Sequence, residues 1–226
     1  MRPEALLSLL QVSDTAFPTG AFAHSMGLEA FYDAGELRDA GDLRSFVELT
    51  LNSLATSDCV ALRSAYAADS VEELTWIDWL LAATKLTREL REASAATGRR
   101  FLASVGALGV EDDLLDGFAA SVRDGASPGN LATGFGVVGP ALDVELPDAL
   151  HAYLYSTAAS LVAAGQKLIP LGGSAAQRVL YELHGKIAEA VEESETLRPD
   201  EMYAFAPTID VRSMLHERQR VRLYIS

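Results

Sequence analysis

The stretch LPDALHAYLYSTAASLV, residues 146–162, decides the fold class of this chain. Its apolar residues recur at intervals of three and four, which places them on one face of an α-helix. Alternating β-branched runs, the pattern of a half-buried strand, do not occur in the sequence, whereas Ala and Leu recur at helical spacing almost everywhere. The sequence therefore predicts an all-α protein.

The same spacing predicts further helices along the chain. They are expected at residues 6–10, at 43–54 with Asp42 as the N-cap, and at 71–86, 86–108 and 175–195. The connections are short, and neither an internal repeat nor a long linker interrupts them. We therefore expect one domain over residues 1–226, a helical bundle of roughly eight to ten helices.

The charge balance narrows the functional class. Lys and Arg number 18 against 32 Asp and Glu, a net charge of −14. Such a surface repels phosphate backbones, so a nucleic-acid partner is not expected. Cys59 is the single cysteine, which excludes an internal disulfide and a cysteine-based metal cluster. Residues 1–10 lack the pattern of a signal peptide, and no window is apolar enough to span a membrane. A soluble cytoplasmic protein is the expectation.

Motifs for cofactors and catalysis give no positive signal. Residues 134–139 fit G-x-G-x-x-G by letter, but the dinucleotide fingerprint needs a preceding strand and a helix opening at its end. The small residues are better explained as allowing a short helix to pack closely on a neighbour. No Walker-type loop is present, and the four histidines lack metal-ligand spacing. We expect no cofactor, no metal site and no catalytic residue.

The segment Ser13–Glu29, SDTAFPTGAFAHSMGLE, joins a Pro-Thr-Gly turn to a short helical start. Pro18 fixes its own φ, and Gly20 permits a close backbone approach. Phe17, Phe22 and Leu28 are expected to anchor the turn in the apolar interior. A rigid, buried turn that leads into a helix is the simplest interpretation.

Two more segments stand out. Pro170 ends the long helix at Ile169, and Gly172 and Gly173 form a corner beside which Lys167 places a cation. From Val211 onward the chain carries four arginines against Glu217 alone, a local charge of +3, together with apolar residues. Such a terminus suits docking, either on its own body or on a partner. We expect a mobile, partner-docking tail over residues 207–226.

Four separated blocks resemble the UreF family of urease accessory proteins. Such proteins have a Pro-x-Gly-x-Phe turn followed by Gly-Leu-Glu, an Arg-Glu-x-Arg segment with a later Gly, a Pro-Leu-Gly corner with a downstream Gln, and a Pro, His-Glu, Arg-Leu-aromatic ending. The matching residues are Phe17, Pro18, Gly20, Phe22 and Gly27-Leu28-Glu29; Arg88–Arg91 and Gly98; Pro170–Gly172 and Gln177; and Pro207, His216-Glu217, Arg222–Tyr224 and Ser226. Gly173 stands where the family usually has Gln, so this chain lacks a polar side chain at that point of the corner.

The resemblance implies a non-enzymatic role. UreF-like proteins are all-helical, tend to dimerise, and join a UreD/UreH-type scaffold and the GTPase UreG in a complex that delivers nickel to apo-urease. The nickel and GTP sites belong chiefly to UreG. By resemblance, the residues 17, 18, 20, 22 and 27–29 form a structural motif. The expected partner-binding residues are Lys167, Pro170, Gly172, Gln177, His216, Glu217, Arg220, Arg222 and Tyr224.

Other interpretations are an all-α adaptor unrelated to urease and an all-α enzyme with a dispersed site. Because symmetric homodimers are the commonest oligomers, and because long apolar-faced helices and residues 134–139 offer surfaces, we also expect a homodimer.

Overall fold

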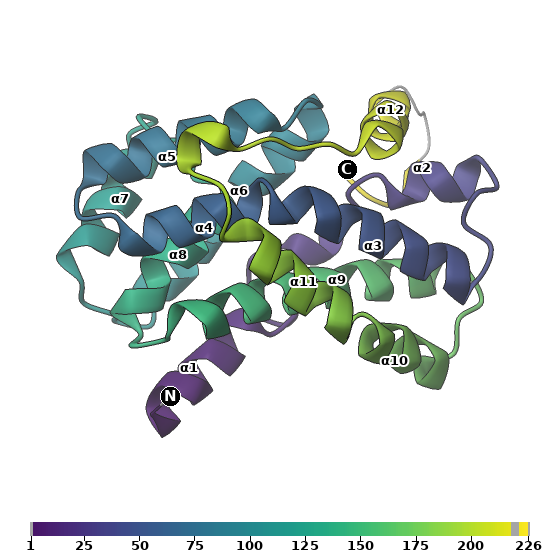
Figure 1. Cartoon of the computed structure of the whole chain (residues 1–226), viewed down its shortest axis with the longest axis horizontal. Coiled ribbons are helices and arrows are strands. Elements are labelled where there is room, and N and C mark those ends of the chain that lie inside the picture. Colours follow the sequence, from purple (N-terminus) through teal and green to yellow (C-terminus); the bar gives the residue numbers. More distant parts are fainter. Residues whose placement is uncertain (1, 218–221, 226) are drawn as a thin grey trace.

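The computed structural model describes residues 2–217 and 222–225, and these contain helices and no strand (Figure 1). The all-α class is therefore confirmed. The elements, in chain order, are α1 (Pro3–Ser13), η1 (Ala21–Ala23), α2 (Leu28–Asp33), α3 (Ala40–Ala55), α4 (Asp58–Ala67), α5 (Val71–Thr84), α6 (Arg88–Gly106), α7 (Asp113–Arg123), α8 (Leu131–Ala141), α9 (Leu146–Leu168), α10 (Gly173–Glu182), α11 (His184–Ser194), η2 (Pro199–Glu201) and α12 (Pro207–His216).

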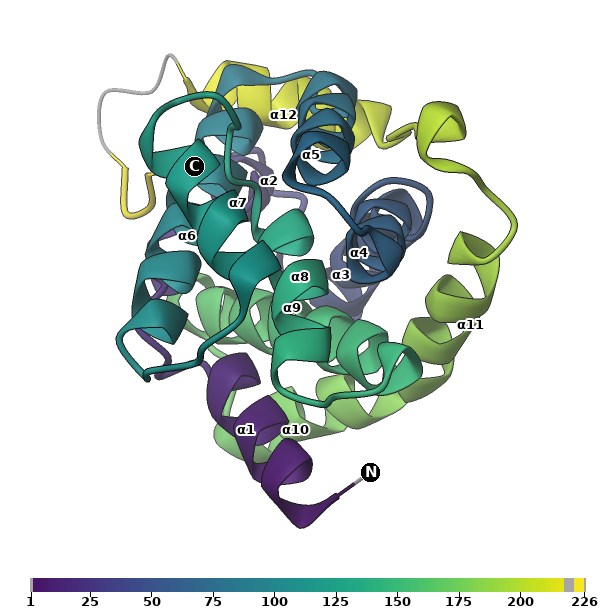
Figure 2. The ribbon, with the colours of Figure 1, turned by 90° about the vertical axis from the view of Figure 1, so that its left-hand side faces the viewer.

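Helix α8 lies inside the bundle and packs on α4, α6 and α9 (Figure 2). A Cβ at Gly136 would collide with the carbonyl group of Leu62, and one at Gly139 would lie 2.9 Å from the ring of Tyr66. The expectation that residues 134–139 form a closely packed short helix is therefore confirmed. The same burial removes this segment as a surface for self-association, so that part of the dimer reasoning was wrong.

Two other boundaries differ from the sequence expectation. Asp39, not Asp42, caps α3, because its carboxylate accepts from the N–H groups of Gly41 and Asp42 at 2.9 and 3.0 Å. The helix expected over 175–195 is interrupted at Leu183. Its N–H is shared between the carbonyls of Val179 and Leu180, and this tightened turn buries the Leu183 side chain completely.

A buried carboxylate fixes the loop that leads into α8. Asp78 of α5 is fully buried and accepts hydrogen bonds from the Ser127 hydroxyl at 2.6 Å, from Gly129 N–H at 2.6 Å and from Asn130. Gly98 of α6 packs directly on the backbone of residues 129–131, where a Cβ would have no room. This close approach explains the glycine in the second sequence block.

The N-terminal and C-terminal parts of the chain meet at one end of the bundle. Helix α12 packs on α2 and on α6, and α2 packs on α9. Figure 1 shows α12 above α2, with the end of the chain beside them, whereas α1 projects from another side. In the part of the chain that the structure describes, no helix combines the length and the apolar character needed to cross a membrane.

Candidate functional site

The C-terminal segment, residues 222–225, lies against the chain's own body. Its backbone is held by Glu29, the first-turn acid of α2, whose carboxylate accepts from Leu223 N–H at 2.7 Å and from Tyr224 N–H at 3.0 Å. The N–H of Ile225 donates to the carbonyl of Ala23 at 2.9 Å. A side-chain carboxylate and a turn carbonyl thus pair with successive backbone donors of the segment.

Tyr224 is the side chain that the segment buries. It is 5% exposed, and its hydroxyl donates to the carbonyl of Ala164 in α9 at 3.2 Å. Lys167 Nζ lies 5.6 Å from the centre of the Tyr224 ring, within the range of a cation–π contact. Burial, followed by the charge of Glu29, raises the pKa of Tyr224, so its phenol stays protonated and donates.

His216, the last residue of α12, sits between two carboxylates. Its ring is fully buried; Nε2 lies 3.1 Å from Glu29 Oε2, and Nδ1 lies 2.9 Å from Glu89 Oε2. Both glutamates are themselves buried. Arg222 closes the set by donating from Nη1 to Glu89 Oε1 at 2.5 Å. We call these four residues, Glu29, Glu89, His216 and Arg222, the tail network.

The tail network shifts the titration of Glu29. Burial alone would raise the pKa of this carboxyl, but hydrogen bonds from Leu223 N–H, His216 and Tyr224 N–H outweigh burial and lower the pKa. Glu29 is therefore ionised at neutral pH. An outer ion pair, Arg88 with Glu217 at 3.4 Å, covers one side of the network.

The structure brings together many of the residues singled out in the sequence. Glu29, Lys167, His216, Glu217, Arg222 and Tyr224 lie in or beside the tail network. Pro170, Gly172 and Gln177 instead lie exposed at the α9–α10 corner. Arg220 lies outside the described residues.

The turn at residues 13–29 matches the expectation in part. Phe17 is buried edge-on against Phe101, Leu28 is fully buried, and Gly20 and Gly27 adopt φ of +73° and +89°. The expectation for Phe22 was wrong, because η1 turns this side chain outward and leaves it 69% exposed. Pro18 lies three residues before η1, and its carbonyl accepts from the Ser104 hydroxyl at 3.4 Å.

The tail has a definite seat in this structure. Both its helical part, α12, and residues 222–225 pack on the body, which is one of the two docking modes that the sequence left open. The expectation that Arg222 would await a partner's carboxylate differs from this arrangement, because Glu89 of the same chain already pairs with it. Mobility of the tail and its transfer to a partner stay predictions.

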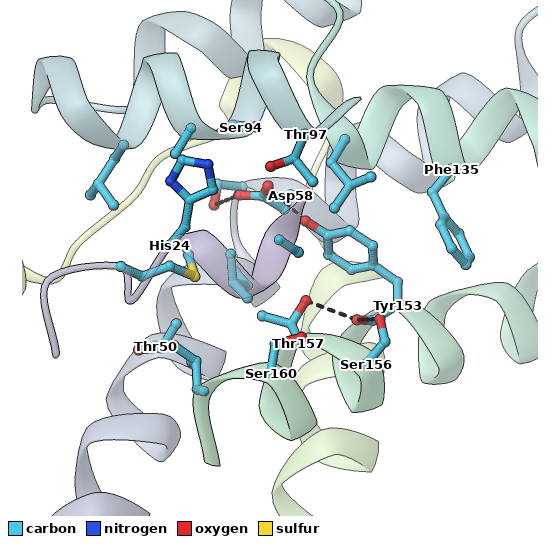
Figure 3. Close-up of a pocket in the computed structure, with 18 of the residues that line it drawn as sticks. His24, Thr50, Asp58, Ser94, Thr97, Phe135, Tyr153, Ser156, Thr157 and Ser160 are labelled. Carbon is cyan, nitrogen blue, oxygen red and sulfur yellow. Dashed lines mark hydrogen bonds between the residues drawn. The ribbon is translucent and has the colours of Figure 1, made fainter. Parts of the chain in front are cut away.

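A second polar centre lies inside the bundle, in a cavity of about 160 Å³ that includes His24, Ser94, Thr97, Thr157 and Ser160 in its lining (Figure 3). Asp58 and Lys85 form an ion pair there with an Nζ–Oδ2 distance of 2.8 Å. The Tyr153 hydroxyl donates to Asp58 at 3.0 Å, and burial holds the pKa of Tyr153 well above its usual value. Burial, followed by the charge of Arg100, lowers the pKa of His24.

Neither centre has the ligand set of a metal site. Among the described residues, no group of three or more His, Cys, Asp or Glu side chains is placed to hold an ion. Every carboxylate oxygen of Asp58 accepts from Lys85, and those of Glu29 and Glu89 accept from N–H groups. The tail network is therefore suited to holding a peptide segment in place.

Comparison with known proteins identifies the family of the chain. The family model "UreF" matches residues 37–184. The chain belongs to the UreF family. It is 38% identical over 221 residues to the urease accessory protein UreF of Paenarthrobacter aurescens, covering 97% of each chain. It is 34% identical over 219 residues to that of Corynebacterium glutamicum, covering 96% of each chain.

The UreF family model ends before the tail and begins after the 13–29 turn, but both relatives extend over nearly the full length. From the sequence, Glu89 belongs to a charge pattern with Arg91 and Glu92 that is typical of a solvated face or of a tether between helices, so its place in the tail network was missed. A usable signal was its position four residues before Ala93 and twelve before Phe101, on the buried face of α6. The neighbouring Arg88–Glu92 pair is present, at 4.0 Å.

Proposed function

We propose that this chain acts in urease maturation as a docking protein, which joins a UreD/UreH-type scaffold to the GTPase UreG and modulates UreG while nickel is delivered to apo-urease. The family assignment supports the general role, since the relatives carry the name urease accessory protein UreF. The observation that carries the docking role is the convergence of three separated sequence blocks on the tail network at one end of the bundle.

The surface around the tail network has the character of a docking face. In segment 222–225, Tyr224 is buried, whereas its neighbours Leu223 and Ile225 are 73% and 62% exposed. The turn that carries Phe22 adjoins this segment, because Ile225 N–H donates to the carbonyl of Ala23. The Phe22 side chain is exposed there. Lys167 Nζ lies over the Tyr224 ring, and Arg222 directly precedes Leu223 in the chain, so both supply cationic groups at this face. A partner with an apolar patch bordered by carboxylates fits this face.

Catalysis has no part in the proposal. Nickel and GTP would be bound by UreG, and this chain would contribute contacts only, with no cofactor of its own and in the cytoplasm.

The exposed Leu6, Leu7 and Leu10 on α1 offer an apolar surface for the expected homodimer. Light scattering on the purified chain should give twice the mass of one chain; a strict monomer at high concentration contradicts that part.

The role is tested by urease activation in cells. Urease subunits are co-expressed with UreD and UreG homologues, with and without this chain, and activity and nickel content of the purified urease are measured. We expect active, nickel-loaded urease only when the chain is present. Equal nickel content without the chain contradicts the proposal.

Lys167 tests the contact with the GTPase. Lys167→Ala removes the cation beside Tyr224, and we expect UreG capture to weaken about tenfold while helix content is kept. Lys186→Ala is the matched control, because Lys186 pairs with Glu189 on the distant α11. Unchanged UreG capture together with a lower Tm would show that Lys167 acts within the fold alone.

A further inference from the structure

The geometry of the tail network limits how many ring nitrogens of His216 can carry a proton. A carboxylate has no hydrogen to donate, and a neutral imidazole has one donor nitrogen and one acceptor nitrogen. Yet both ring nitrogens of His216 lie within 3.1 Å of glutamate oxygens. A neutral ring would therefore set one nitrogen lone pair against a carboxylate oxygen, which is repulsive in a buried site.

The two glutamates have other reasons to be ionised. Glu29 accepts from the N–H groups of Leu223 and Tyr224, and Glu89 accepts from the Arg222 guanidinium. With a neutral His216, Arg222 would be the one cation that the described residues place on these two buried carboxylates. With an imidazolium, two negative charges meet two positive ones. Charge balance and hydrogen-bond geometry thus select the same protonation state.

We propose that His216 is a positioning residue, held as an imidazolium between Glu29 and Glu89, and that its second proton is required to seat the C-terminal segment 222–225. The imidazolium fixes the Glu29 carboxylate so that its oxygens face Leu223 N–H and Tyr224 N–H. It also fixes Glu89 opposite Arg222. Without that proton, the two glutamates repel each other and the segment is no longer held in place.

Among the residues that the structure describes, few other charges lie near enough to replace the imidazolium. On α6, Arg88 pairs with Glu217 and with Glu92, and Lys167 of α9 lies over the Tyr224 ring. Across α12 the hydroxyls of Thr87 and Ser213 bond to each other at 3.1 Å. Within the described residues, the structure therefore records two cationic partners for Glu29 and Glu89, which are His216 and Arg222.

The inference rests on the proposed function only because it takes residues 222–225 as a docking segment. Its test uses the isolated full-length chain, so the result does not depend on any partner. NMR spectra of the ¹⁵N-histidine-labelled chain report each ring nitrogen. We expect both nitrogens of His216 to be protonated at pH 7, with assignment by the signals lost in His216→Gln. A neutral-tautomer pattern at pH 7 with the segment seated overturns the proposal.

Seating is measured by hydrogen exchange of the Leu223 and Tyr224 amides, corrected for the intrinsic pH dependence of exchange. In the wild-type chain their protection should fall together with the loss of the second His216 ring proton in the NMR spectra. In His216→Gln we expect protection to be at least about tenfold lower at pH 7 and to lose this pH dependence. His184→Gln, a change at an exposed histidine on α11, should leave both unchanged. Protection that is independent of His216 titration in the wild-type chain contradicts the proposal even if His216→Gln does not fold.

Discussion

Replacing Lys85 by Met should destabilise the chain through the carboxylate that it leaves behind. Lys85 ends α5 as its C-cap, and Asp58 begins α4, so each charge also suits the dipole of its own helix. Their side chains are only 10% and 3% exposed. Without the ammonium group, Asp58 keeps the hydroxyls of Ser57 and Tyr153 at 3.1 and 3.0 Å, but no counter-charge.

Removing one partner of a buried ion pair costs about 3–5 kcal/mol, and the remaining hydroxyls and the α4 dipole favour the lower end. A loss of about 3 kcal/mol corresponds to a fall in Tm of about 6–12 °C for a chain of this size. Asp58→Asn combined with Lys85→Met should cost clearly less than the sum of the single changes, because the double variant buries no unpaired charge.

The assay is thermal and urea unfolding followed by circular dichroism at pH 7. Lys186→Met serves as control, since its pair with Glu189 is solvent-exposed on the glutamate side and should be worth less than about 1 kcal/mol. The reasoning is refuted if the Tm of Lys85→Met lies within about 2 °C of the wild-type Tm. It is also refuted if the stability loss of the double variant equals the sum of the losses of the two single variants.

Three other outcomes follow from named contacts. The pKa of Glu29 is lower in the folded chain than its ordinary 4.5, so the stability that Glu29 contributes is present above that pH and is lost as the pH falls through the folded pKa. Glu29→Gln should therefore weaken the fall in unfolding free energy at acid pH, and an unchanged dependence on pH contradicts this. Burial raises the pKa of the Cys59 thiol well above its usual value, so a thiol reagent at pH 8 should label the native chain only as fast as it unfolds, whereas prompt stoichiometric labelling would show an accessible thiolate. Gly98→Ala should cost about 1–3 kcal/mol, because its Cβ meets the backbone of residues 129–131, which cannot rotate away; Gly106→Ala, on the same helix with open space at the Cβ, should be neutral or stabilising.

Helical periodicity was enough to predict the fold class. The long helix α9 and the packing role of residues 134–139 follow directly from spacing and residue size. The break at Leu183 does not follow from spacing, because Leu183 continues the apolar stripe; Gly185 weakens the helix two residues later, and burial of Leu183 favours the tightened turn. Phe22 likewise has the composition of a core residue, and the direction of η1 alone turns it outward.

The candidate site was predictable as a set of blocks but not as a network. Glu29, His216 and Arg222 were singled out, whereas their partner Glu89 was interpreted as part of a solvated face or of a tether between helices, because a carboxylate among arginines is usually exposed. Contacts between residues 127 or more positions apart, such as His216 with Glu89, depend on the tertiary arrangement. Local periodicity carries no information on such pairs.

The docking role itself is tested most directly by binding of purified UreD and UreG homologues to the immobilised chain. We expect a stable complex with the wild-type chain and an affinity at least about tenfold lower with Arg222→Ala, which breaks the pair with Glu89 and loosens the docking face. Arg44→Ala, which removes an exposed ion pair with Glu182 on the distant α3–α10 side, should bind as the wild type does. Absence of binding by the folded wild-type chain, or equal binding by Arg222→Ala, would contradict a docking function at the tail network.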